Sequence, residues 1–181
     1  MNTLLQDESL LIGSREEIQK LATKDSARIL VVSDSHGAYS NLLLILRQFG
    51  VASDALVFCG DGICDISKLI SNAVDEAEIK AIIPPVIGIV EGNNDADLYP
   101  VRNVLSDEPY YVQWKVPIFN VLEACGQRIF CFSFSRAVST PLGSRCSWLP
   151  SIYMIAASPA LPCFFGRLRP NISPSPFSSS S

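Results

Sequence analysis

Three short polar segments carry the side chains that could do chemistry, and each directly follows a run of apolar residues. The first is Asp34-Ser35-His36, the second is Gly60-Asp61, and the third is Gly92-Asn93-Asn94-Asp95. Carboxylate, imidazole and amide groups are ligands for divalent transition metals. Taken singly, each segment is better explained as a polar turn, because Asp, Asn and Gly are common turn residues. Their order and positions together make a metal site the stronger interpretation.

The elements around these segments decide whether the three can meet. Apolar, β-branched runs predict strands at residues 28–34, 55–61 and 85–95, and helical patterns lie between them at 41–49 and 66–81. This alternation predicts parallel strands joined by right-handed crossovers. In such sheets, ligands bind outside the carboxyl ends of the strands. We therefore expect all three polar segments at one edge of a sheet.

Further elements are expected on both sides of this unit. The segment Ser14–Glu17 has the Ser-x-x-Glu form of a capping box and predicts a short helix to about Ala22. Ser40 is expected to cap the helix at 41–49. Asp65 is expected to cap the helix at 66–81, and we give it no further role. Two later runs, YYVQW and VPIFNVLEACGQRIF, predict a hairpin from a further sheet.

Composition excludes several function classes. The net charge is −4 and no stretch is rich in Lys or Arg, so we expect no clear nucleic-acid site. The acidic N-terminal residues do not form a signal peptide, and Pro159 and Pro162 break the most apolar late stretch, so no membrane segment is expected. Six irregularly spaced cysteines indicate free thiols in a reducing compartment. The predicted location is cytoplasmic.

The chain changes composition near residue 130. The last acidic residue is Glu123, and seven of the twelve prolines follow Phe132. A segment so rich in Ser and Pro is a poor candidate for packed structure. We therefore divide the chain into an N-terminal helical extension (1–27), a folded domain (28–131) and an atypical tail (132–181).

Together, the segments VVSDSHGAYSN, DALVFCGDG and VIGIVEGNND resemble motifs of the calcineurin-like metallophosphoesterase superfamily, most of all its small phosphodiesterase branch. The resemblance covers roughly residues 28–130. It implies an α/β fold of four layers, an α/β/β/α sandwich with two sheets packed face to face, of which the C-terminal part is incomplete here. It also implies a metal-dependent phosphoesterase, and specifically a phosphodiesterase, acting on small phosphodiesters or phosphomonoesters.

The resemblance also implies roles for individual residues. Asp34 and His36 would bind a first metal ion, Asp61 would bridge two ions, and Asn93 would bind the second through its side-chain oxygen. The two divalent ions would bind phosphate oxygens and activate a water, with Mn²⁺ as first choice and Fe, Zn, Ni or Mg as alternatives. We assign Asn94 and Asp95 to the catalytic set. Asn94 stands where larger relatives have a histidine, and Asp95 is expected to orient a neighbouring ligand or to stabilise its own turn.

The chain departs from the superfamily pattern after these motifs. The later histidine motifs are missing, and His36 is the only histidine, so we expect an incomplete second metal set and impaired activity. Because composition changes at the same place, we hypothesise that codons after about residue 130 are frameshifted or come from a degraded gene. The alternative function is a non-catalytic protein-binding scaffold with the same fold. An unrelated α/β protein with matching turns is a third interpretation, and the oligomeric state stays open.

Overall fold

A computed structural model describes residues 2–102 and 111–132 of the 181-residue chain. Apart from Phe132, the predicted Ser/Pro-rich tail lies outside the described residues. The frameshift hypothesis concerns the same stretch and stays a prediction.

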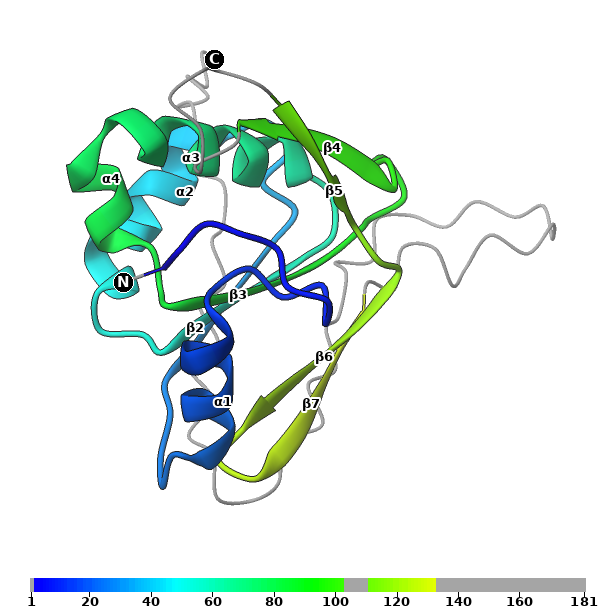
Figure 1. The fold of residues 1–181 in the computed structure, drawn as a ribbon. Coiled ribbons are helices and arrows are strands. Elements are labelled where there is room, and N and C mark those ends of the chain that lie inside the picture. The colour runs from blue at the N-terminus through cyan, green and yellow to red at the C-terminus, as the bar shows by residue number, and fades with distance from the viewer. Residues whose placement is uncertain (1, 103–110, 133–181) are drawn as a thin grey trace, which may run out of the picture.

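Three parallel strands form the centre of the fold, in the order β1 (Ile29–Ser33), β2 (Ala55–Cys59) and β3 (Val86–Val90) (Figure 1). Every residue of β2 and β3 is buried. A strand that is covered on both faces needs apolar side chains at every position, and this explains why both strands appear in the sequence as unbroken apolar runs. The predicted strands and their parallel direction are confirmed.

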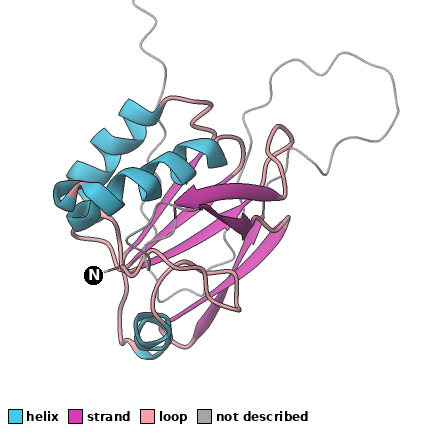
Figure 2. Cartoon of the chain, turned by 45° about the horizontal axis from the view of Figure 1, so that its top comes forward, coloured by secondary structure: helices cyan, strands magenta, loops and turns pink. Residues whose placement is uncertain are grey.

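One face of this sheet is covered by helices: α2 (Tyr39–Ile45) with the π-helical turn η1 (Leu46–Gly50), α3 (Ile63–Asp75) and α4 (Ala77–Ile82) (Figures 1 and 2). Leucines and isoleucines of these helices pack against Leu56, Phe58, Ile87 and Ile89 of the sheet in one apolar cluster.

Two helical predictions need correction. The stretch 66–81 is not one helix, because Glu76 has an extended backbone (φ −109°, ψ 96°) and separates α3 from α4. Ser40 does not cap the preceding helix, because α2 already begins at Tyr39 with Ala38 at the capping position. Both errors concern element boundaries, which local sequence signals define poorly.

A hairpin of β6 (Phe119–Ala124) and β7 (Gln127–Phe132) packs on the other face of the parallel sheet. Its inward side chains Leu122, Ala124, Ile129 and Cys131 join a second apolar cluster with residues of β2 and β3. The α/β fold with two β layers and outer helices is therefore as predicted, for the part of the chain described.

Helix α1 (Arg15–Thr23) packs against β6 and the hairpin turn. The backbone N–H of Cys125 donates to the Leu21 carbonyl at 3.1 Å, and that of Gly126 donates to the Ala22 carbonyl at 2.7 Å. The Ser14 hydroxyl accepts from the N–H of Glu17 at 3.2 Å, which confirms the predicted N-cap.

The run YYVQW has a different partner from the one expected. Its last four residues lie in β5 (Tyr111–Lys115), which pairs antiparallel with β4 (Leu98–Arg102), whereas β6 pairs with β7. The sequence does not predict β4, because it contains Pro100 and a proline within a run argues against a strand. Here the carbonyl of Pro100 accepts from the Ser67 hydroxyl of α3 at 2.7 Å, which fixes β4 against that helix.

The first residues of the chain tie the layers together. Ile12 forms an antiparallel bridge to Ile87 of β3, and the Gln6 carboxamide makes a paired contact with the backbone of Lys115, donating at 2.7 Å and accepting at 3.0 Å. In the residues described, no helix is both long and apolar enough to cross a bilayer.

Candidate metal centre

The carboxyl ends of β1 and β2 bring three of the four predicted ligands together. One ligand atom from each of Asp34, His36 and Asp61 lies within 4.8 Å of the other two. Asp61 is buried, Asp34 is half-buried and His36 is exposed. The group is therefore shielded from solvent at Asp61 and accessible to solvent at His36. Asn93, the predicted ligand of a second ion, lies exposed in the loop after β3, and its role stays a prediction.

The loop after β1 has an unusual backbone. Asp34 and His36 adopt left-handed conformations with φ of 48° and 46°, and Gly37 follows with φ of 82°. A left-handed conformation costs a non-glycine residue on the order of 1–2 kcal/mol. Two such residues within three positions show that the loop is bent to present both side chains to the same place.

Two glycines allow the three loops to come this close. A Cβ atom at Gly92 would lie 1.9 Å from Oδ1 of Asp61, inside the space that carboxylate occupies. A Cβ atom at Gly62 would lie 2.2 Å from Oγ of Ser35, and Gly62 has a φ of 128° that disfavours any side chain. Both positions therefore require glycine for the site to form.

The predicted catalytic residue Asn94 contacts the central carboxylate directly. Its backbone N–H donates to Oδ1 of Asp61 at 2.9 Å, and its side-chain amide donates to Oδ2 at 2.5 Å. The N–H of Asp61 in turn donates to Oδ1 of Asp34 at 3.3 Å. Asn94 thus orients Asp61, whereas its assignment to catalysis stays a prediction.

The Asp95 carboxylate binds its own turn and a neighbouring loop, whereas its assignment to the catalytic set stays a prediction. One carboxylate oxygen accepts from the N–H of Gly92 at 3.0 Å within its own turn. The other accepts from the N–H groups of Gly62 and Ile63 and from the Tyr99 hydroxyl, each at 3.1 Å. Since Gly62 and Ile63 begin α3, Asp95 caps that helix from a neighbouring loop and fixes the segment that carries Asp61.

A family model for calcineurin-like phosphoesterases matches residues 27–144. The chain belongs to the calcineurin-like phosphoesterase family. No curated protein and no solved structure gives a significant match. The matched range contains all three polar segments, so the motif resemblance is confirmed for the family, and the small phosphodiesterase branch is not tested by it.

The electrostatics of this phosphoesterase site favour a cation. Burial raises the pKa of the Asp34 carboxyl, and the nearby Asp61 carboxylate adds to the rise, although hydrogen bonds from Ser33 and Asp61 oppose it. Two carboxylates with an imidazole between protein loops form a hard and borderline donor set that suits divalent ions. A divalent ion would remove the repulsion between Asp34 and Asp61, so the residues present fit the metal that the family implies.

One residue near the site was wrongly assigned from the sequence. Asp65 was expected only to cap the following helix, but α3 already begins at Ile63 and the Asp65 carboxylate caps nothing. Instead it accepts from the Ser35 hydroxyl and, at 3.0 Å, from the N–H of Gly37. An aspartate four residues after Asp61 has no local signal that would reveal a contact to a loop about thirty residues away in the sequence.

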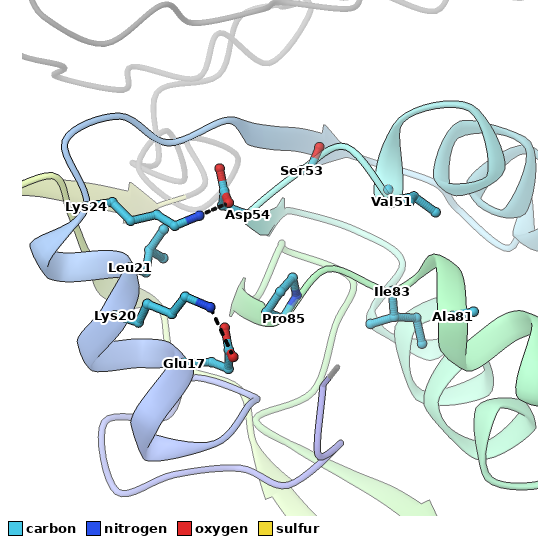
Figure 3. Close-up of a pocket in the computed structure, with 11 residues that line it drawn as sticks. Glu17, Lys20, Leu21, Lys24, Val51, Ser53, Asp54, Ala81, Ile83 and Pro85 are labelled. Carbon is cyan, nitrogen blue, oxygen red and sulfur yellow. Dashed lines mark hydrogen bonds and ion pairs between the residues drawn. The ribbon is translucent and has the colours of Figure 1, made fainter.

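The described cavity lies elsewhere in this phosphoesterase (Figure 3). It has a volume of about 300 Å³ and opens between α1 and the loops that precede β2 and β3, at the amino edge of the sheet. Lys20 and Lys24 line it, but each is paired with a carboxylate, Glu17 and Asp54 respectively. We place the chemistry at the carboxyl edge, because the ligand cluster is there.

Proposed function

We propose that this protein is a metal-dependent phosphodiesterase of the small phosphodiesterase branch, with two divalent ions and Mn²⁺ as the first choice. The observation that carries the proposal is the convergence of Asp34, His36 and Asp61 within 4.8 Å in a chain of the calcineurin-like phosphoesterase family.

Each loop has a distinct part in this proposal. Asp34 and His36 would bind one ion, Asp61 would contact both ions, and Asn93 would supply an oxygen to the second. Divalent ions in such sites polarise the phosphoryl oxygens and lower the pKa of a bound water. Asn94 orients Asp61, and Asp95 fixes the loop behind it. The single histidine leaves the second ion with few ligands, so we expect weak binding of that ion and modest turnover.

The charge of the site favours a diester over a monoester. Residues 33–38, 60–65 and 91–97 contain no Lys or Arg and carry several carboxylates. A phosphodiester has one negative charge near neutral pH, whereas a phosphomonoester approaches two, since its second pKa is about 6. The two ions attract both substrates, but these loops offer no cationic side chain to the additional charge of a monoester.

The test compares two artificial substrates with and without added Mn²⁺. We expect Mn²⁺-dependent hydrolysis of bis-p-nitrophenyl phosphate at a higher kcat/KM than that of p-nitrophenyl phosphate. Asp61→Asn should lower the diester rate by at least about 100-fold, since a metal ion contributes several kcal/mol to such a transition state. Asp75→Asn, on the exposed end of α3, is the matched control. Equal rates for the wild type and Asp61→Asn would exclude metal-dependent catalysis by this chain.

A non-catalytic scaffold with the same fold remains the second candidate, and one observation favours it. Ile118, Phe119 and Phe130 are 57%, 50% and 41% exposed, and the two phenyl rings stack with centroids 5.8 Å apart on the outer face of the β6–β7 hairpin. Exposed aromatic groups of this kind mark interaction surfaces. Metal content by mass spectrometry separates the candidates, because a purified protein without metal and without turnover supports the scaffold.

A further inference from the structure

Asp65 lies in the first turn of α3, with only 4% of its surface exposed. Its Oδ2 atom accepts hydrogen bonds from the Ser35 hydroxyl and from the N–H of Gly37. These two residues flank His36 on both sides. We infer that Asp65 is a positioning residue of the metal centre, which fixes the His36 imidazole through Ser35 and Gly37. The inference rests on the proposed function, since it assigns Asp65 to the same metal site.

The loop needs such an anchor because its conformation is costly. Asp34, His36 and Gly37 all have positive φ, so a free loop would relax towards extended or right-handed conformations. The His36 side chain is exposed, so packing does not immobilise it. The backbone N–H of His36 does donate to the Asp61 carbonyl, but at 3.3 Å this is a long hydrogen bond.

The two hydrogen bonds to Asp65 are strong because their acceptor is a buried carboxylate. A buried carboxylate that lacks donors is costly, and a hydrogen bond to a charged group is stronger than one between two neutral groups. The Ser35 and Gly37 donors are therefore held firmly on a helix that is itself packed in the core. Because Asp65 belongs to α3, these hydrogen bonds restrict the motion of Ser35 and Gly37, the residues on either side of His36.

Gly62 allows the loop to lie close to α3. Because it has no side chain, Ser35 Oγ and the N–H of His36 can lie 2.2 Å and 3.0 Å from the position that a Cβ atom would take. The loop therefore lies directly against the start of α3. Residues 35–37 therefore pack against Gly62 and are held by hydrogen bonds to Asp65.

The first arm of the test measures Mn²⁺ affinity by isothermal titration for the full chain and for Ser35→Ala, Asp65→Ala and the double variant. Loss of a group that orients a metal ligand typically lowers metal affinity by about 10–100-fold. We expect a loss of about ten-fold for Ser35→Ala and a larger one for Asp65→Ala. The double variant should bind no more weakly than Asp65→Ala, because the two residues share one contact.

Ser67→Ala is the matched control. It removes a hydroxyl from the same helix, but that hydroxyl donates to Pro100 and does not touch the loop. We expect its Mn²⁺ affinity to equal that of the wild type. If Asp65→Ala does not fold, Ser35→Ala against Ser67→Ala decides, since both remove one hydroxyl and leave the buried carboxylate in place.

The second arm uses the metal-free protein. His36 is the only histidine, so ¹³C-carbonyl histidine combined with ¹⁵N-glycine selects the amide of Gly37 alone. This N–H donates to Asp65, and Ser35→Ala should speed its hydrogen exchange by about ten-fold through easier local opening. Ser67→Ala should leave it unchanged.

The outcomes separate the inference from the proposed function. A wild type that binds no Mn²⁺ contradicts the proposed function. In that case, the hydrogen-exchange rate of the Gly37 amide still tests whether Asp65 holds the loop. A wild type that binds Mn²⁺ while Ser35→Ala and Asp65→Ala bind equally well overturns the inference alone. Fully additive losses in the double variant, or an unchanged Gly37 exchange rate in Ser35→Ala, overturn it as well.

Discussion

The carboxyl and amino edges of the parallel sheet hold their loops in different ways. At the carboxyl edge, carboxylates accept hydrogen bonds from backbone N–H groups, and the loops pass one another through glycine. At the amino edge, the Asp54 carboxylate accepts from the Lys24 ammonium and, at 2.7 Å, from the N–H of Arg28. The loops at 33–38, 60–65 and 91–97 of the first edge carry carboxylates and no Lys or Arg, and the first of them has a strained backbone. The second edge has paired charges around a cavity.

The edge that has the cavity is therefore not the edge that is suited to bind a charged ligand. The amino-edge cavity has a volume of about 300 Å³, but the charges of Lys20 and Lys24 that line it already have carboxylate partners. At the other edge, Asp34 and Asp61 face each other, and the pKa of Asp34 rises mainly through burial and further through that repulsion. A ligand is needed where like charges converge, so the electrostatics and not the volume identify the site.

The largest difference between the two edges is expected when a methyl group is added at each of them. Gly92→Ala places a Cβ 1.9 Å from the Asp61 carboxylate, whereas Gly50→Ala places one 2.0 Å from the Ile82 carbonyl beside the cavity. Both variants should lower the melting temperature. Only Gly92→Ala should also weaken Mn²⁺ binding, by at least about 100-fold, because it displaces a direct ligand.

Titration calorimetry below the melting temperature of each variant measures this effect. If folded Gly50→Ala loses as much Mn²⁺ affinity as Gly92→Ala, the two edges are coupled, and the metal site is not confined to the carboxyl edge.

Sequence alone predicts the site where the ligands follow directly from the strands. Asp34, His36 and Asp61 lie within three residues of a strand end, so the parallel topology is enough to bring them together. Asp65 could not be found in this way, because its partners Ser35 and Gly37 meet it only through the packing of α3 against the sheet. The cap that Asp95 gives to α3 is also tertiary, since it comes from another loop.

The two antiparallel strand pairs show the same limit. The hairpin of β6 and β7 is local, with its turn at Cys125 and Gly126, and the alternating pattern predicts it. The pairing of β5 with β4 depends instead on contacts of β4 with α3, and no pattern in YYVQW indicates its partner.

A medium effect is expected from Asp54 at the amino edge. Burial would raise the pKa of its carboxyl, but hydrogen bonds from Lys24 and Arg28 outweigh this and lower it. A lowered folded-state pKa means that the stabilisation is fully present above the unfolded pKa, about 3.9, and is lost as the pH falls through the folded value. Asp54→Asn should therefore cost about 1 kcal/mol at pH 7, a modest figure because the pair is partly exposed to solvent.

Urea unfolding at pH 7 and near pH 3 checks this prediction. The difference between Asp54→Asn and the wild type should shrink at the lower pH, while Mn²⁺ affinity at pH 7 should be the same in both. A stability difference that grows on acidification would show that the Asp54 pKa is raised and not lowered.

The smallest effect is expected from Lys20, which lines the cavity and pairs with Glu17 at 3.6 Å. Its side chain is 62% exposed, and such surface pairs contribute between zero and about 1 kcal/mol. Lys20→Ala should therefore change neither the melting temperature nor the KM for bis-p-nitrophenyl phosphate appreciably. A phosphate bound in the cavity would depend on this ammonium for its countercharge, so its loss would raise KM several-fold at unchanged Mn²⁺ affinity. That result would move substrate binding to the amino edge, whereas an unchanged KM leaves the acidic carboxyl edge as the place where the phosphate binds.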